Sequence, residues 1–382
     1  MNNKADVIII GSGIIGNSTA YYLAQRGLDV LVLERSANIG DGASSRNGAG
    51  VRLSSRVSPE SDLAAEAIRK IWPTLGADLD ADLDADLEYE TPGSLTLATN
   101  ASQEAGLESA LKKTLAAGVK AEIISGGEVR TLCPYLAPIV TKALFCPEDG
   151  FANPMVTTLA YYRKNRKLGV RYVTGENVVS LRKVRGQMRQ VVTENGTVYE
   201  ADRVVLAAGF NSRRIAESVG IWLPFLKRVD ECIVTEVQPP MFRYRVSVAG
   251  GHFYGHQTRH GSFIFGGNTD LERYELTYDG KARNTNKSCP DKARTAGKYI
   301  PALADAKVVR QWAGWLDSMV DRLPVMQEIP EIPGLILACG FSGHGFAIGP
   351  AAGKCIAQLA VGESPCVDLS ALRYDRFKPH GC

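Results

Sequence analysis

Three glycines near the amino terminus have the spacing of a phosphate-binding turn. Gly11, Gly13 and Gly16 follow the pattern G-x-G-x-x-G. In such a turn the first glycine allows a tight bend, the second lets the backbone approach a pyrophosphate, and the third lets a helix pack closely on a strand. Glu34 follows Gly16 by 18 residues, where a carboxylate can accept hydrogen bonds from both ribose hydroxyls. The spacing therefore predicts a dinucleotide-binding site rather than a purely structural turn.

The residues around the glycines have the patterns of a strand, a helix and a second strand. Residues 7–10 are a continuous β-branched run, which is typical of a strand buried on both faces. Helical spacing of apolar side chains covers residues 15–23, and Gly27 suits the end of such a helix. Residues 30–33 form a second buried run that leads to Glu34. This order brings the free N–H groups and positive end of the helix to the expected pyrophosphate.

The composition is that of a globular protein with a large core. The chain has 382 residues, 45% apolar and 22% charged, which suits two domains or one large composite α/β unit. A formal net charge of +3 without a basic stripe argues against a nucleic-acid partner. Residues 60–90 hold ten acids and two bases, which predicts a solvated acidic face. The positive remainder would suit an anionic cofactor or substrate.

The eight cysteines form no CxxC pair and no spacing typical of metal ligands. Because the chain does not begin with the pattern of a secretory leader, we expect reduced cysteines and a cytoplasmic protein. The apolar runs are broken by glycine, and none reaches the ~20 residues that cross a bilayer. The sequence therefore predicts no metal site and no transmembrane segment.

Three further segments combine small residues with a turn or a buried strand. They are residues 42–50 (GASSRNGAG), 203–212 (RVVLAAGFNS) and 334–353 (GLILACGFSGHGFAIGPAAG). Small residues let the backbone pass beside a planar ring, although taken alone the first segment could be a surface loop and the second a plain core strand. Together with the glycine turn they resemble the D-amino acid oxidase, glycine oxidase and sarcosine oxidase family of FAD-dependent amine oxidoreductases. The resemblance spans nearly the whole chain.

The resemblance implies FAD as the cofactor, bound without a covalent link. Some members attach FAD to a cysteine a little under thirty residues before the carboxyl-terminal motif, but residues 311–315 contain none here. His344 is either a structural hydrogen-bonding residue or a group that tunes the flavin. The cofactor-binding residues that the resemblance implies are Gly11, Gly13, Ile14, Ile15, Gly16, Glu34, Arg35, Ala43, Ser44, Ser45, Arg46, Asn47, Gly48, Val178, Ala207, Ala208, Gly209, Gly314, Gly343, His344, Gly345 and Phe346.

The implied fold is α/β, with a Rossmann-like FAD-binding domain interleaved with an α+β substrate domain built on an antiparallel sheet. The FAD-binding domain is expected at residues 1–90, 145–215 and 310–382, and the substrate or partner domain at 91–144 and 216–309, with boundaries good to about 15 residues. The strands expected on the substrate side include residues 91–98, 232–237 and 261–267.

The implied reaction is oxidation of a C–N bond in a secondary amine or amino acid. A neutral amine places its α C–H over flavin N5, hydride passes to the ring, and the imine product hydrolyses in water. Because the flavin carries this chemistry, we assign no catalytic base. Candidates for contact with substrate or flavin, each of which could instead have a packing or surface role, are His252, Tyr254, His256, Arg259, Asp317 and His344.

Two departures from single-chain amino-acid oxidases bear on the expected substrate and assembly. Such oxidases place an arginine for the substrate carboxylate shortly after the Trp-Ala-Gly stretch, but Leu316, Asp317 and Ser318 follow here. Asp317 would repel a carboxylate and could instead pair with a cationic group such as guanidinium. Residues 45–48 resemble β-subunits of multisubunit dehydrogenases, which include opine oxidases, D-hydroxyproline dehydrogenase, hydrogen cyanide synthase and heteromeric proline dehydrogenase.

This second resemblance implies a catalytic subunit that oxidises an opine such as octopine or nopaline. Its expected partners are an α-subunit and an electron-transfer subunit, with peripheral membrane association only through them. FMN at a subunit interface is a further option, and a 2Fe-2S cluster is expected only on a partner because this chain lacks Cys₄ spacing. The alternatives are a self-sufficient amino-acid or N-methyl-amine oxidase that produces hydrogen peroxide, and an electron-transfer or assembly subunit whose FAD never meets substrate.

Overall fold

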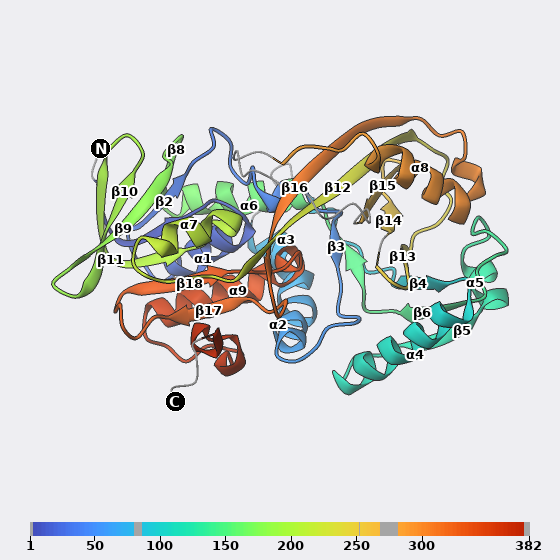
Figure 1. Ribbon diagram of the computed structural model, residues 1–382, viewed down its shortest axis with the longest axis horizontal. Coiled ribbons are helices and arrows are strands. Elements are labelled where there is room, and N and C mark those ends of the chain that lie inside the picture. The colour runs from blue at the N-terminus through green and yellow to red at the C-terminus, as the bar shows by residue number, and fades with distance from the viewer. Residues whose placement is uncertain (1–2, 80–85, 252, 268–281, 378–382) are drawn as a thin grey trace.

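The computed structural model describes residues 3–79, 86–251, 253–267 and 282–377. Within these residues, two eight-stranded sheets form separate halves of an elongated molecule (Figure 1). The long strands β12 (Phe225–Val237) and β16 (Val308–Met319) run between the halves (Figure 1). The fold is therefore α/β with two sheets whose strands come from interleaved segments of the chain.

The first sheet contains the glycine turn. Its order is β17-β18-β11-β1-β2-β8, with β10 pairing β11 and β9 pairing β10. The strands from β18 to β8 pair in parallel, whereas β17, β9 and β10 pair antiparallel. The bounds are β1 (Lys4–Ile10), β2 (Val30–Glu34), β8 (Arg171–Thr174), β9 (Val178–Val184), β10 (Gln187–Thr193), β11 (Val198–Leu206), β17 (Val325–Glu328) and β18 (Leu335–Cys339).

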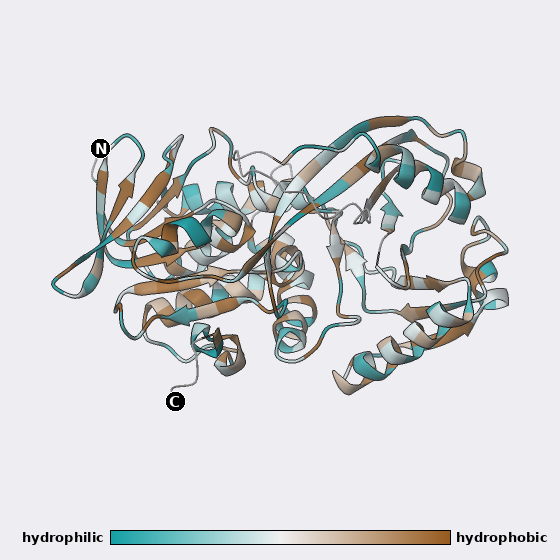
Figure 2. Cartoon of the chain, viewed as in Figure 1, coloured by the Kyte–Doolittle hydropathy of each residue, from teal (hydrophilic) through white to brown (hydrophobic). Residues whose placement is uncertain are grey.

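Both faces of this sheet are covered, which explains the continuous apolar run in β1. Val7 and Ile9 pack in one core with α1 (Ile14–Ala24), α6 (Pro154–Lys167) and α9 (Gly345–Ala360). Ile8 and Ile10 pack on the opposite side with α7 (Ser212–Glu217). Figure 2 shows hydrophobic residues in the central strands of this sheet. The predicted strand, helix and second strand of the amino-terminal unit are thereby confirmed.

The second sheet has the order β16-β12-β15-β14-β13-β4-β6-β5. All its pairings are antiparallel except β4 with β13, so the expected antiparallel platform contains one parallel pair. The three predicted substrate-side strands lie in β4, β12 and β15. The remaining bounds are β4 (Ser94–Ala98), β5 (Glu122–Ser125), β6 (Lys142–Cys146), β13 (Arg245–Val248), β14 (Tyr254–Gln257), β15 (Ser262–Gly267), α4 (Ala101–Ala116), α5 (Gly126–Leu132) and α8 (Ser288–Tyr299).

A short third sheet joins the two halves. It pairs β3 (Gly50–Val51) with β7 (Gly150–Phe151). α2 (Glu60–Glu66), a π-helical turn (Ala67–Ile71) and α3 (Trp72–Asp78) follow in one helical stretch beside α9. The Trp72 indole N–H fixes this stretch by donating to the Ala347 carbonyl of α9 at 2.8 Å.

The prediction of a solvated acidic face over residues 60–90 is wrong at two positions. Glu60 is 3% exposed and Glu66 is 7% exposed. Glu60 pairs with Arg56, and Glu66 pairs with Lys70 and Lys354. Composition cannot reveal that Glu60 and Glu66 are buried, because burial depends on partners elsewhere in the fold. Residues 80–85 of this segment lie outside the described part of the chain.

Some expectations remain without a test. The domain boundaries stay a prediction, although β16 begins at Val308 and lies in the second sheet.

The seven described cysteines form no disulfide. Over the described ranges, no helix is long and apolar enough to cross a membrane. The same ranges hold no group of three or more His, Cys, Asp or Glu residues arranged for a metal ion.

Candidate active site

The turn between β1 and α1 requires glycine at two positions. Gly11 has φ +103°, and a Cβ there would lie 2.5 Å from the Ala207 carbonyl oxygen. A Cβ at Gly16 would lie 2.0 Å from the Gly11 carbonyl oxygen. The first N–H of α1, on Ile14, donates to the Ser44 hydroxyl at 2.8 Å. The turn at Gly11 therefore lies against the residues that follow β11, and the start of α1 contacts segment 42–50.

Glu34 ends β2 with a buried carboxylate that is 8% exposed. One oxygen accepts hydrogen bonds from the Ser12 N–H at 2.9 Å and the Ser12 hydroxyl at 2.7 Å. The other accepts from the Ser36 N–H at 2.9 Å. These bonds hold the glycine turn against β2, and the oxygen that accepts only the Ser36 N–H has a further lone pair for a ligand hydroxyl.

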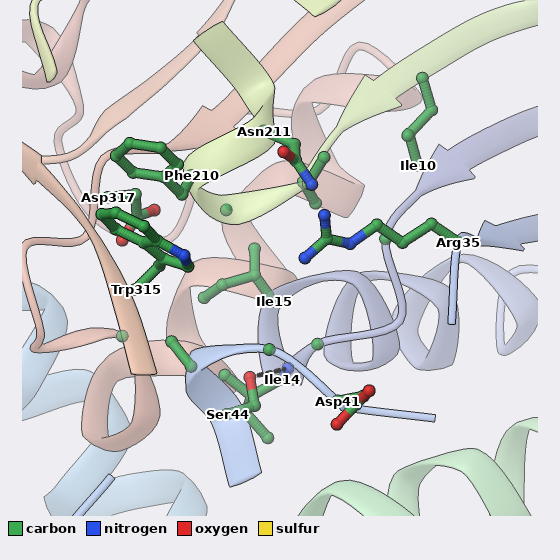
Figure 3. Close-up of a pocket in the computed structure, with 18 of the residues that line it drawn as sticks. Ile10, Ile14, Ile15, Arg35, Asp41, Ser44, Phe210, Asn211, Trp315 and Asp317 are labelled. Atoms are coloured by element: carbon green, nitrogen blue, oxygen red, sulfur yellow. Dashed lines mark hydrogen bonds between the residues drawn. The ribbon is translucent and has the colours of Figure 1, made fainter. Parts of the chain in front are cut away.

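One cavity of about 1370 Å³, counting its open mouth, runs from this turn toward β16 and the start of α9. Figure 3 shows Arg35, Asp41 and Ser44 around one part of it and Phe210, Trp315 and Asp317 around another. The structure brings together at its wall the predicted residues Gly11, Gly13, Ile14, Ile15, Glu34, Arg35, Ala43, Ser44, Arg46, Asn47, Val178, Ala207, Ala208, Gly209, Gly343, Gly345 and Phe346, together with the candidate Asp317.

Five predicted cofactor residues do not line this cavity: Gly16, Ser45, Gly48, Gly314 and His344. Gly16 lies behind the turn, and Gly314 lies against Arg46, where a Cβ would be 3.0 Å from the Arg46 Cβ. Gly48 faces Tyr254, whose ring would be 2.3 Å from a Cβ. These glycines therefore allow close packing of backbone around the cavity rather than forming its wall.

Sequence reasoning missed several lining residues. Phe210 and Trp315 stack with centroids 4.9 Å apart and planes at 20°. Phe210 lies in segment 203–212 and Trp315 in segment 311–315, and aromatic residues beside small ones in these segments could have indicated the cavity wall. The other missed residues are Ile10, Leu33, Ser36, Asp41, Gly42, Glu176, Asn177, Asn211, Ile215, Leu316, Ala338 and Phe341.

Arg46 is fixed by groups of this chain. Its guanidinium pairs with Asp41 at 2.7 Å, and its carbonyl accepts the Trp312 indole N–H at 3.1 Å. Arg46 and Asp41 therefore place opposite charges next to each other at the cavity wall. Arg35, also at the wall, is a second cation there (Figure 3).

His344 precedes α9 and contacts an ion pair that is buried between Arg56 and Glu60. Its Nδ1 lies 2.7 Å from Glu60, which pairs with Arg56 at 2.8 Å. Burial by itself opposes ionisation of Glu60, but Arg56 and His344 outweigh it and lower the pKa of Glu60 to about 2. Burial lowers the pKa of His344, and Glu60 offsets this only in part. A neutral His344 thus donates through Nδ1 to an ionised carboxylate.

Asp317 points into the region of Phe210 and Trp315 (Figure 3). Its carboxylate accepts the Gly340 N–H at 2.8 Å, and its carbonyl accepts the Ser342 N–H at 3.3 Å. Burial raises the pKa of Asp317 to about 6, although backbone hydrogen bonds act in the opposite direction. Asp317 therefore organises the loop before α9 from the cavity wall.

The substrate-side candidates separate into two groups. Tyr254 and His256 lie on β14, and His256 is 2% exposed and stacks on Phe151 with centroids 4.2 Å apart. Burial and the nearby Arg245 lower the pKa of His256 to about 3. Arg259 instead pairs with Asp86 and lies 3.5 Å from Glu90. His252 lies outside the described residues.

The residues around the cavity fit an adenine dinucleotide with a flavin. The glycine turn leaves a backbone cradle that any side chain at Gly11 would fill, α1 begins there, and Glu34 stands at the end of β2. The far part of the cavity is lined by aromatic and small residues, which suit a planar ring. Such a fold and site define a dinucleotide-binding flavoprotein.

The chain belongs to the FAD dependent oxidoreductase family, whose match covers residues 6–359. It is an FAD-dependent oxidoreductase that acts on amines or amino acids. The beta subunit of sarcosine oxidase from Rhizobium meliloti (strain 1021) is 31% identical, over 98% of this chain and 88% of the relative. The B subunit of opine oxidase from Rhizobium meliloti is 25% identical, over 97% and 98%. The crystal structure of glycine oxidase from Geobacillus kaustophilus matches with a TM-score of 0.90 and 24% identity, over 98% and 99%.

Proposed function

We propose that this chain oxidises the C–N bond of a carboxylate-bearing secondary amine, such as an opine of the octopine or nopaline type. In this proposal it is the catalytic FAD subunit of a multisubunit dehydrogenase. The observation that carries the proposal is the continuous cavity that joins the glycine turn to the loop before α9. Relatives whose names mark them as the beta or B component of a larger enzyme support the assembly.

The protein's own residues bind and orient rather than react. Glu34 and the start of α1 would hold the ribose and pyrophosphate of FAD, and Gly343, Gly345 and Phe346 would border its ring. Bound FAD supplies the hydride acceptor for C–N oxidation. The positive end of α9 faces the cavity through Gly345, where it favours negative charge. Hydrolysis of the imine needs only water.

The partners in this proposal are an α-subunit and an electron-transfer subunit. FMN would lie at a subunit interface, and an iron–sulfur cluster would belong to a partner. A cytoplasmic location, with membrane association only through those partners, is part of the same proposal. The second candidate is a self-sufficient oxidase, which is favoured by the 25% identity of glycine oxidase from Geobacillus kaustophilus over 98% of both chains.

An anaerobic bleaching panel tests the proposed reaction. The purified yellow protein is mixed without oxygen with sarcosine, proline, hydroxyproline, octopine and nopaline, and loss of the flavin absorbance is followed. We expect the secondary amines to bleach the flavin, with the opines most effective. Absence of bleaching by every amine, in protein that dithionite still reduces, would favour an electron-transfer or assembly role.

The same preparation tests how FAD is held. No cysteine lines the described cavity wall, so acid precipitation should release intact FAD into the supernatant. Flavin that stays with the precipitated protein would contradict non-covalent binding. Chromatography of the supernatant identifies FAD and any FMN.

A further inference from the structure

Two cysteine thiols meet at the end of α9. The Sγ atoms of Cys355 and Cys366 lie 3.5 Å apart, in hydrogen-bond contact. Cys355 lies within α9 and is completely buried, whereas Cys366 follows the helix and is exposed. A disulfide has its sulfurs about 2 Å apart, so these two atoms need to approach by only ~1.5 Å to be joined. A small local movement is therefore enough to bring the pair to bonding distance.

The turn after α9 places Cys366 over Cys355. Just past the end of the helix, Gly362 has φ +76° and reverses the chain. The Glu363 N–H donates to the Gln358 carbonyl at 2.9 Å, and the Cys366 N–H donates to the Gln358 side-chain oxygen at 2.8 Å. Gln358 follows Cys355 by three residues, so both side chains lie on one face of α9. The hydrogen bonds to Gln358 thereby hold the two thiols together.

The two thiols differ in acidity. The hydrogen bond with Cys366 and burial both raise the pKa of the Cys355 thiol. The hydrogen bond from Cys355 lowers the pKa of the Cys366 thiol, and Lys354 acts in the same direction, whereas desolvation opposes this shift. Cys355 is thus the hydrogen-bond donor, and Cys366 is the sulfur that becomes a thiolate. Because the thiolate is the nucleophile, the exposed member of the pair reacts first.

The charged groups around Cys366 favour an anionic sulfur. One oxygen of the Glu66 carboxylate pairs with Lys354 at 2.9 Å, and the other pairs with Lys70 at 2.7 Å. One carboxylate that is shared by two ammonium groups leaves a net positive charge beside the thiol pair. Tyr22 of α1 faces the same groups and stays neutral, because burial raises the pKa of its hydroxyl. The surroundings therefore stabilise the thiolate that reacts.

We propose that Cys366 is a site of oxidation by hydroperoxides and that Cys355 is its resolving cysteine. The Cys366 thiolate attacks one oxygen of hydrogen peroxide, the O–O bond breaks and hydroxide leaves, so the sulfur is oxidised to a sulfenic acid. The Cys355 sulfur then attacks the Cys366 sulfur, the S–S bond forms and the S–O bond breaks. The Cys355 proton and the departing hydroxide form water. Two thiols are thereby oxidised to a disulfide, and one peroxide is reduced to two waters.

This site protects the helix that borders the cavity, whichever amine the enzyme oxidises. α9 begins at Gly345 on the cavity wall and carries Cys355 in the core that it shares with α1. Oxidation of Cys366 to a sulfinic acid would be irreversible, whereas a disulfide returns to two thiols when a thiol reductant attacks it. The second candidate function, a self-sufficient oxidase, would itself produce the hydrogen peroxide. The pair thus converts oxidative damage beside α9 into a reversible modification.

Peptide mapping of the peroxide-treated protein tests the site. The full chain with FAD bound is exposed to hydrogen peroxide in the absence of substrate, the remaining free thiols are alkylated, and the digested protein is analysed by mass spectrometry. We expect a peptide in which Cys355 and Cys366 are joined, and the alkylated forms of these two residues should disappear together. Treatment with dithiothreitol before alkylation should restore both. Cys382, which lies outside the described residues, is followed in the same digest.

Three variants separate the roles of the two thiols. Cys366→Ser should leave Cys355 reduced, because a buried thiol does not meet peroxide. Cys355→Ala should abolish the linked peptide and let Cys366 proceed to sulfinic acid, which dithiothreitol does not restore. Cys289→Ser is the matched control, since Cys289 is half-buried on α8 in the other half of the molecule, and it should form the linked peptide as wild type does. Thermal unfolding and FAD content are measured for each variant to confirm that it is folded.

The wild-type digest decides the proposal even where a variant does not fold. Oxidation of Cys289 before Cys366, or sulfinic acid at Cys366 without the linked peptide, would overturn it. So would a disulfide that joins Cys366 to Cys382 or to a second copy of the chain, which electrophoresis without reductant detects. Reversible oxidation of Cys366 alone in Cys355→Ala would remove the resolving role from Cys355. None of these outcomes depends on the amine panel, so this site and the proposed function stand or fail separately.

Discussion

At the scale of single residues, the buried carboxylates of the site are held by specific hydrogen-bonding partners. Glu34 secures the glycine turn through Ser12, and Glu60 is secured by Arg56 and His344. A carboxylate that is removed from water keeps its charge only when donors surround it. The same reasoning makes Arg245 conspicuous, because its donors remain without a carboxylate in the described structure.

Glu34→Ala should weaken FAD binding roughly tenfold to a hundredfold, the range for a charged hydrogen bond. The variant removes the acceptor expected for the ribose and also frees Ser12, whose N–H lies 2.9 Å from the carboxylate. Fluorescence titration of the deflavinated protein with FAD measures the dissociation constant. Glu363→Ala is the control, since Glu363 pairs with Arg26 at 2.6 Å and does not line the cavity. Unchanged FAD affinity in Glu34→Ala would place the ribose contact elsewhere.

Glu60→Gln should make stability less dependent on acid pH. The pKa of Glu60 is about 2 in the folded protein against an ordinary value of 4.5, so ionised Glu60 stabilises the fold above pH 4.5 and loses this contribution as pH falls toward 2. At pH 7 we expect wild type to be more stable by on the order of 3 kcal/mol. Urea unfolding at pH 7, 5 and 4 should show the gap narrowing at the lowest pH. A gap that does not change with pH would contradict this account.

At the scale of elements, the position of α9 against α1 decides whether the cavity forms. A Cβ at Gly353 would lie 2.2 Å from the Ser18 hydroxyl, and one at Gly349 would lie 2.8 Å from Ile14. The Ser18 hydroxyl donates to the Gly349 carbonyl at 2.9 Å. The glycines of the carboxyl-terminal motif therefore have two roles. Gly343 and Gly345 line the cavity, and Gly349 and Gly353 let α9 pack closely on α1.

Gly353→Ala should destabilise the protein by about 1–3 kcal/mol, the usual effect of overpacking, and should also reduce the FAD content. The added methyl has no room between α9 and α1. Gly106→Ala is the matched control because Gly106 lies within α4 with nothing within 4 Å of its added Cβ. That variant should stabilise by roughly 0.5–1 kcal/mol through helix propensity. The urea midpoint of unfolding is measured for both variants and for wild type. If both variants shift the midpoint in the same direction, α9 is not tightly packed on α1.

At the scale of the whole molecule, local patterns could predict the first sheet but not the long-range site. The run 7–10, the glycine spacing and Glu34 are close in sequence, and each specifies its own conformation. The contacts from Arg56 through Glu60 to His344 join residues that are 288 positions apart, and Arg245 meets Gly50 only because β13 and β3 come together in the fold. Burial of a charged residue depends on such distant partners, so the sequence alone predicts that Glu60 is an ordinary exposed acid.

The division into two sheets also bears on where electrons go after substrate oxidation. The described cavity is lined both by strands of the first sheet and by the end of β16, which belongs to the second sheet. Relatives named as components of multisubunit enzymes match this chain almost completely, which means that the resemblance extends over both halves. In our proposal, the reduced cofactor is then reoxidised by a partner rather than by oxygen.

We therefore expect slow turnover with oxygen alone and fast turnover with a partner chain or an artificial dye. The reason is that a protein whose electrons pass to another protein has no need of a site that activates oxygen. The measurement compares peroxide production by the isolated chain with its dye-coupled rate, using the amine that bleaches the flavin best. Co-purification from the native source should recover a larger partner, and adding it back should raise the rate with its own acceptor. A peroxide rate equal to the dye-coupled rate would show instead that the chain is a free-standing oxidase.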